Sequence, residues 1–169
     1  MPEQSPTFRM RPATIADITT ICHHRVAMFT HMGRVDDTIA EELATANAAY
    51  LRDAIPSGEY LGWLAETDGH DVAAGVGVQR RRVLPFPRTH AGGRKDVAGG
   101  QQAIVVNVYT EPHFRRRGLA RLLMREVLDW ARATGIESVV LHAAPDGRPL
   151  YQELGFIDTN EMRFAGELP

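Results

Sequence analysis

The spacing of hydrophobic residues divides the first third of the chain into a short strand and two helices. Residues 7–11 predict the strand. Apolar positions three and four residues apart predict an amphipathic helix over residues 15–30. Thr14 stands at its N-cap and Asp17 follows three residues later, in the arrangement of a capping box.

A second apolar stripe of helical period follows the break at Met32-Gly33. It predicts a helix that starts at Asp36 or Asp37 and ends before Pro56. The residues of the stripe are Ile39, Leu43, Ala46 and Tyr50.

The middle of the chain has the pattern of strands. Residues 60–67 and 72–79 are apolar runs separated by the turn-forming tetrapeptide 68–71, which predicts a β-hairpin. Residues 80–102 carry two prolines and two Gly-Gly pairs without periodicity. We expect a long loop there, and such loops in compact domains are usually functional or mobile.

The last third alternates strand and helix. Residues 103–109 form an almost uninterrupted apolar run, which predicts a central strand buried on both faces. An amphipathic helix follows and ends at Gly135. Residues 138–143 predict a strand and residues 146–154 a short helix. We expect residues 156–167 to return as one or two strands.

This order of elements predicts an α+β fold with a mixed, mostly antiparallel sheet. We expect six to seven strands flanked by about four helices, with one right-handed strand–helix–strand crossover in the second half. The 169 residues fit a single domain spanning 1–169.

Composition narrows the classes of function. Hydrophobic residues make up 44% and charged residues 24%, which is ordinary for a globular protein. The formal net charge of -2 argues against a nucleic-acid-binding protein, because such domains usually carry a basic excess. Cys22 is the sole cysteine, so neither an intramolecular disulfide nor a cysteine-based zinc site can form, and it is expected in the core. No apolar run is long enough to span a bilayer, and we expect a cytoplasmic protein.

The residues from Arg115 to Ala120 form a candidate phosphate-binding loop. They lie between the buried strand and the amphipathic helix, where a helix N-terminus presents unpaired N–H groups and a positive dipole end. Gly118 and Ala120 remove side-chain bulk, and three arginines supply bidentate donors. Taken alone, the hexapeptide fits a solvated basic turn equally well. A second triplet, Arg80 to Arg82, has no glycine-led helix after it, so a solvated or substrate-facing loop is the better interpretation there.

Two segments together resemble the GCN5-related N-acetyltransferase (GNAT) superfamily. Asn107 to Ala120 is similar to the family's acetyl-CoA-binding segment, a strand followed by Pro-x-x-Arg/Gln-x-x-Gly-x-Gly/Ala and a long helix. Pro149 to Phe156 is similar to the downstream "LYxxLGF" segment, and the gap between the two accommodates one helix and one strand. The resemblance is strong over residues 103–158, which would form the cofactor-binding core.

The resemblance implies an N-acyltransferase that moves an acetyl group from acetyl-CoA to a primary amine by direct attack, without a metal. The strand before the loop would hold the pantetheine arm, and a backbone N–H near Val108 would bind the developing oxyanion. The implied cofactor-binding residues are Val108, Tyr109, Thr110, Arg115, Arg116, Arg117, Gly118, Leu119, Ala120 and Arg121.

The resemblance also implies candidates for proton transfer. Tyr151 matches the tyrosine that often protonates the departing thiolate in this superfamily. Glu111 and His142 are both candidates for the general base, and nothing in the sequence separates them. Ala144 stands where many members have an asparagine, so cofactor contacts from that side are in doubt. We expect the other histidines to be solvated or at the rim of the site.

The partner would be the amine group of a small molecule or peptide, with no nucleic acid and no membrane; a homodimer stays open. By family position, residues 27–37 and 80–102 would form the acceptor surface. One alternative is a catalytically silent module that binds acyl-CoA as a sensor. Another is a nucleic-acid-binding domain that uses the two arginine triplets.

Overall fold

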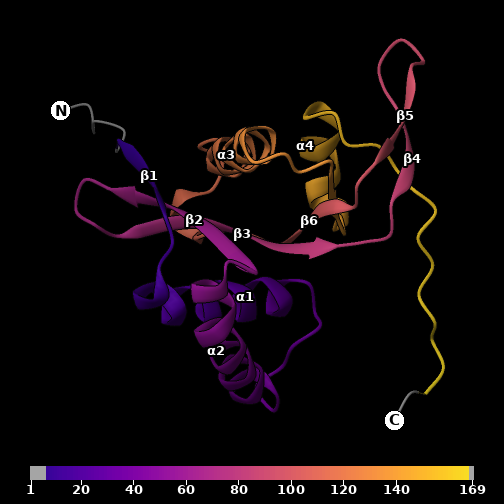
Figure 1. Cartoon of the computed structure of the whole chain (residues 1–169). Helices are drawn as coiled ribbons and strands as arrows, with labels where there is room; N and C mark the ends of the chain where they lie inside the picture. Colours follow the sequence, from indigo (N-terminus) through magenta and orange to yellow (C-terminus); the bar gives the residue numbers. More distant parts are fainter. Residues whose placement is uncertain (1–6, 168–169) are drawn as a thin grey trace.

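A five-stranded mixed sheet forms the centre of the computed structural model, which describes residues 7–167 (Figure 1). Its strands, in spatial order, are β1 (Phe8–Pro12), β2 (Tyr60–Thr67), β3 (Val72–Arg82), β6 (Gln101–Thr110) and β7 (Ser138–Leu141). The first three pairings are antiparallel and the β6–β7 pairing is parallel. The predicted class, a mixed and mostly antiparallel sheet, is confirmed.

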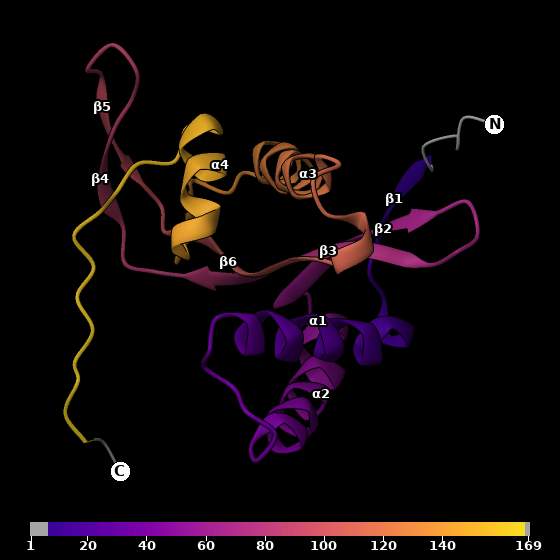
Figure 2. The same ribbon diagram turned by 180° about the vertical axis from the view of Figure 1, so that it is seen from behind.

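Helices cover both faces of the sheet, as Figure 1 and the reverse view in Figure 2 show. Helices α1 (Ile18–His31) and α2 (Ala40–Ser57) lie on one face. Helices α3 (Leu119–Ala133) and α4 (Arg148–Glu153) lie on the other. About four helices were expected. Three of them are preceded by a short 3-10 turn: η1 (Ile15–Asp17) before α1, η2 (Pro112–Phe114) before α3 and η3 (Pro145–Gly147) before α4.

The core is divided by the sheet into two clusters. On the α3 face, the buried residues come from β2, β3, β6 and α3, with Leu119, Leu123, Met124 and Val127 supplied by the helix. The α1–α2 face has a smaller cluster, which consists of Ile21, Cys22, Leu51, Ala54 and Tyr60. Cys22 is therefore the core residue that the sequence predicted.

A β-bulge interrupts the central strand. Gly77 of β3 pairs with Asn107, but the next residue, Val78, pairs with Val105, so Val106 is an extra residue on β6. Val106 packs against the α1–α2 cluster, and Asn107 accepts a hydrogen bond from Tyr60 of the same cluster at 3.3 Å. Two successive side chains thus face α1 and α2. A Cβ at Gly77 would collide with the Tyr60 hydroxyl, so glycine is required there.

The second helix starts later and ends later than predicted. The Asp36 side chain accepts hydrogen bonds from the N–H and the hydroxyl of Thr38, a local turn that delays the helix to Ala40. Pro56 lies inside the last turn of α2 and not beyond it; the helix ends at Ser57, and its C-cap Gly58 has φ of +73°.

The prediction of a long loop over residues 80–102 is wrong, because most of this segment forms strands. β3 continues to Arg82, and β4 (Phe86–Thr89) pairs with β5 (Lys95–Ala98) in a separate two-stranded sheet. Side-chain pairing supports this ribbon: the Asp96 carboxylate lies 3.0 Å from Arg88 Nε and 2.7 Å from His90 Nε2. Together the two sheets hold seven strands in residues 7–167.

The strands expected over residues 156–167 do not form. This segment runs extended from α4, and β7 is the outer strand of the five-stranded sheet (Figure 1). After Phe156, which packs against the core, the large apolar side chains of the segment are exposed, with Met162 at 94% and Phe164 at 71%.

Candidate active site

The candidate active site is a cleft that opens where β6 and β7 separate. The two strands pair only from Gln102 to Val105 on β6, and β7 ends at Leu141. Beyond that point a cleft of about 720 Å³ runs between the second half of β6, η3 and the C-terminal end of α1. The main chain of Val106 to Thr110 therefore lines the cleft without a β7 partner.

The loop between β6 and α3 has two residues in left-handed backbone conformations. Arg116 has φ of +65° and Gly118 has φ of +78°. Gly118 is the N-cap of α3 and provides no side-chain cap, and nothing lies within 4 Å of where its Cβ would be. The first N–H groups of the helix therefore have no side-chain cap, and an uncapped helix N-terminus is an arrangement that binds anions.

Three arginines surround this helix terminus. The Arg115 Nε donates to the Thr110 carbonyl at 3.1 Å, and its guanidinium carbon lies 5.9 Å from the Tyr109 ring centroid. Arg117 lies over the Phe114 ring at 5.7 Å. Within the described residues, none of Arg115 to Arg117 forms an ion pair with a carboxylate. Arg121, also predicted as a cofactor ligand, pairs with Glu153 of α4 instead.

Tyr151 reaches the same cleft from the opposite side. It lies on α4, half-buried, with its ring edge-on to Phe156 at 6.0 Å. A Cβ at Gly147 would lie 2.9 Å from the tyrosine ring, so glycine leaves the room that this ring position needs. Burial raises the pKa of Tyr151, which keeps the phenol protonated.

The two candidate bases lie in different places. His142 lines the cleft just beyond β7, where its Nε2 contacts the Glu161 carboxylate at 2.6 Å. Glu111 follows β6 on the α1 side, 2.8 Å from His23 Nε2, and does not line the cleft. The structure therefore brings Val108, Tyr109, Thr110, Arg115, His142 and Tyr151 to one cleft. Glu111 and the predicted cofactor-binding residues 116–121 do not line it.

His24 is a buried histidine that the sequence analysis placed wrongly at the rim. Its side chain is 1% exposed, and its Nδ1 has no hydrogen-bond partner within the described part of the chain. Nε2 lies 3.5 Å from the Glu111 carboxylate, and burial lowers the pKa of His24 to about 4. A Cβ at Gly75 would lie 2.8 Å from Nδ1. The spacing of three residues from Ile21 is the sequence signal that places it in the core.

Only one of the two segments expected to form the acceptor surface lines the cleft. Met28, Phe29, His31, Met32 and Arg34, at the end of α1 and just after it, line the cleft. No residue of 80–102 does, because the β4–β5 ribbon projects away from α1 and α2 (Figure 2).

The fold and cleft can be compared with known proteins. The model of the acetyltransferase (GNAT) family matches residues 24–156, which is most of the chain. The chain belongs to the GNAT family. No curated protein sequence matches this chain at a significant level.

Solved structures of GNAT proteins share the fold over nearly their whole length. A GCN5-related N-acetyltransferase from Ralstonia eutropha JMP134 is 30% identical, with a TM-score of 0.82 over 95% of this chain and 100% of that one. A predicted acetyltransferase from Clostridium acetobutylicum, solved with acetyl-CoA, is 22% identical, with a TM-score of 0.75 over 95% and 96%. The aminoglycoside 6'-N-acetyltransferase AAC(6')-Ih from Acinetobacter baumannii is 17% identical, with a TM-score of 0.68 over 96% and 99%. The last two show the likeness of fold alone.

Two further features bear on the site. Across residues 7–167, no three His, Cys, Asp or Glu side chains converge in a way that could hold a metal ion. The same residues contain no helix that combines the length and apolar character needed to cross a bilayer.

The depressed pKa of His24 predicts an acid-sensitive fold. Because the unfolded chain binds a proton near pH 6.5 and folded His24 only near pH 4, the free energy of unfolding should fall as the pH drops through this window. The expected loss is at most about 3 kcal/mol. Urea unfolding from pH 7 to pH 4 would measure it. His24→Gln should flatten the slope and the neighbouring His23→Gln should retain it; an unchanged slope in His24→Gln would contradict this assignment.

Proposed function

We propose that this GNAT protein is an acetyl-CoA-dependent N-acetyltransferase of a small-molecule or peptide amine. The observation that carries the proposal is the cleft itself, which follows an unpaired stretch of β6 between Tyr151 and Arg115, three residues before the uncapped helix N-terminus at Gly118. We treat residues 1–169 as one catalytic domain, with donor contacts concentrated in residues 103–158.

The chain offers matching partners along the length of the donor. The pyrophosphate of acetyl-CoA would accept hydrogen bonds from the first N–H groups of α3, with Arg115 to Arg117 compensating its charge. Pantetheine carries amides, and the free main chain of Val106 to Thr110 could pair with them as β7 pairs with the first half of the strand. The acetyl group would then reach the middle of the cleft.

Proton transfer would complete the reaction. The backbone N–H near Val108 would stabilise the oxyanion, and Tyr151, held protonated by burial, would donate a proton to the departing thiolate. His142 lines the cleft and is the nearer candidate for accepting the proton of the ammonium group, directly or through water. Glu111, which contacts His23 and lies 3.5 Å from His24 Nε2, does not line the cleft and would act only through intervening groups.

Replacement of Gly118 by valine should abolish stabilisation by acetyl-CoA. Saturating ligand should raise the Tm of the native chain by several degrees, since a hundredfold excess over Kd adds about 2.7 kcal/mol. Gly118→Val places branched carbons over the helix N–H groups and should remove the shift.

Gly135→Val is the matched control for this substitution. Gly135 also has a positive φ, +72°, and open space around it, but it lies just past the other end of α3. Both variants should lose about 1–2 kcal/mol of stability from left-handed strain, yet only Gly118→Val should fail to respond to acetyl-CoA. A native chain that shows no shift would contradict donor binding.

Removal of the Tyr151 hydroxyl should slow turnover. Tyr151→Phe should lower kcat by about 10²–10⁴ with little change in the affinity for acetyl-CoA, because the hydroxyl acts on the leaving group. Release of CoA thiol measures the rate. Tyr50 does not line the cleft and its hydroxyl donates to Glu59, so Tyr50→Phe is the control. Full activity in Tyr151→Phe would exclude it as the acid.

A further inference from the structure

Arg25 is a half-buried cation without an anionic partner. It projects from α1 into the cleft, where Nη1 donates to the Val106 carbonyl at 2.9 Å. That carbonyl belongs to the bulged residue of β6. Among the described residues, no carboxylate lies within ion-pair distance of Arg25, and burial lowers its pKa. Since a desolvated charge is unfavourable unless it is paired, the remaining guanidinium donors call for a bound anion.

A second arginine, Arg34, lies over the same aromatic ring as Arg25, that of Phe29. The guanidinium carbon of Arg25 lies 5.0 Å from the Phe29 ring centroid, and that of Arg34 lies 5.2 Å from it. Arg34 is exposed and also forms no ion pair with any described carboxylate. The stacking fixes both planar cations at one side of the cleft, where an acceptor anion could contact them.

The charges that line the cleft are mostly positive. Asp146 is the sole acidic side chain among the described lining residues, against the four arginines Arg25, Arg34, Arg115 and Arg163. A cleft lined by one sign of charge attracts ligands of the opposite sign. Arg115 lies beside the predicted donor loop, which leaves Arg25 and Arg34 at the acceptor side.

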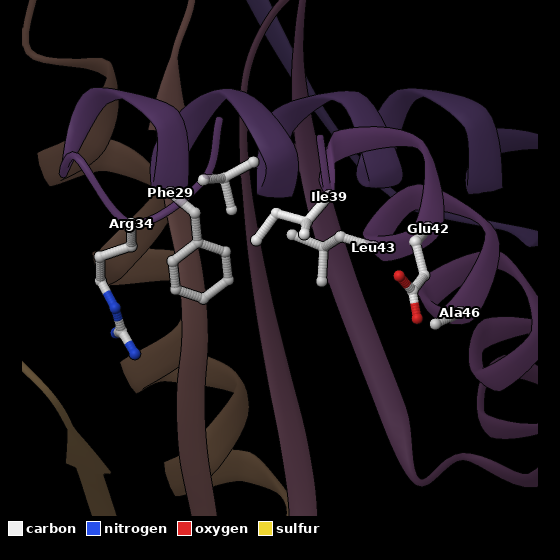
Figure 3. A pocket seen from close by; sticks show the side chains of 7 residues that line it. Phe29, Arg34, Ile39, Glu42, Leu43 and Ala46 are labelled. Carbon is white, nitrogen blue, oxygen red and sulfur yellow. The ribbon is translucent and has the colours of Figure 1, made fainter. Parts of the chain in front are cut away.

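A largely apolar groove of about 460 Å³ continues from Arg34 and Phe29 between α1 and α2. Figure 3 shows Arg34 and Phe29 at one end, Ile39 and Leu43 in the middle, and Glu42 and Ala46 at the other end. Phe29 and Arg34 line both the groove and the cleft. A ligand whose anion lies at the arginines could therefore place an apolar group over Ile39 and Leu43.

We propose that the acceptor is a primary amine that carries an anionic group, a carboxylate or a phosphate, which Arg25 and Arg34 bind, and an apolar portion that occupies the groove. This proposal rests on the proposed acetyltransferase function and specifies its substrate class. Arg25 is anchored to the strand that would carry the acetyl group, so the bound anion would place the amine near the thioester.

The same charges disfavour polycationic acceptors. The Acinetobacter baumannii protein is an aminoglycoside acetyltransferase by name, and an aminoglycoside carries several ammonium groups. In this chain such a ligand would meet two unpaired arginines on the acceptor side. Like charges in a partly desolvated site repel, so shared fold does not carry that substrate over to this protein.

A panel of matched amines in the presence of acetyl-CoA tests the proposal, with CoA thiol release as the readout. L-Leucine and L-phenylalanine would be compared with their carboxamides, O-phosphoethanolamine with ethanolamine, and kanamycin would represent polycations. We expect the kcat/KM of at least one anionic amine to exceed that of its counterpart without the anionic group at least tenfold. Turnover limited to uncharged or cationic amines, or no turnover of any anionic amine by a chain that binds acetyl-CoA, would overturn it.

Substitutions show whether the arginines cause the preference. Arg25→Gln and Arg34→Gln should each reduce the ratio of anionic to uncharged kcat/KM at least fivefold while the KM for acetyl-CoA stays unchanged. Arg34 is exposed, so its variant should fold even if Arg25→Gln does not. Arg132→Gln, on the exposed side of α3 beside Asp129, should keep the ratio. An unchanged ratio in Arg34→Gln and in a folded Arg25→Gln would overturn the assignment. Loss of acetyl-CoA binding by the native chain would instead contradict the underlying function.

Discussion

The arrangement of the site depends on the point at which β6 leaves β7. Their parallel pairing ends at Val105 and Leu141, and the very next residue, Val106, is the bulge opposite β3. The bulge turns Val106 toward α1 and presents its carbonyl to Arg25, while the rest of the strand continues without a partner on the β7 side. The cleft therefore begins at the bulged residue, whose carbonyl also holds the cation of Arg25 at the α1 side of the cleft.

Electrostatics separates the two ends of this cleft. At the proposed donor end, the N-terminus of α3 has no side-chain cap and is preceded by three arginines, which suits a pyrophosphate. At the acceptor end, two guanidinium groups are held by an aromatic ring and a carbonyl. Between them, Tyr151 is kept protonated by burial, and His24 behind β6 is kept neutral by the same effect. Burial thus sets the protonation states, and the arginines set the charge.

The sequence predicted the elements whose period is regular and missed those that depend on side-chain pairing. The α3 stripe and the runs of β2, β3 and β6 were placed correctly, because each buries a whole face. The β4–β5 ribbon was missed, since the pairs of Asp96 with Arg88 and His90 leave no periodic trace. The bulge at Val106 and the contact of its carbonyl with Arg25 could not be predicted either, because the register of a strand depends on its partner strand.

In the proposed complex, acetyl-CoA binds along the unpaired half of β6 with its pyrophosphate on the N-terminus of α3. Amide hydrogen exchange with and without acetyl-CoA tests it at the level of single segments. Bound acetyl-CoA should slow amide exchange at residues 106–110 and 116–121 and change exchange little in β1 and β2. Unchanged exchange in both of these segments, or protection confined to α2, would contradict it.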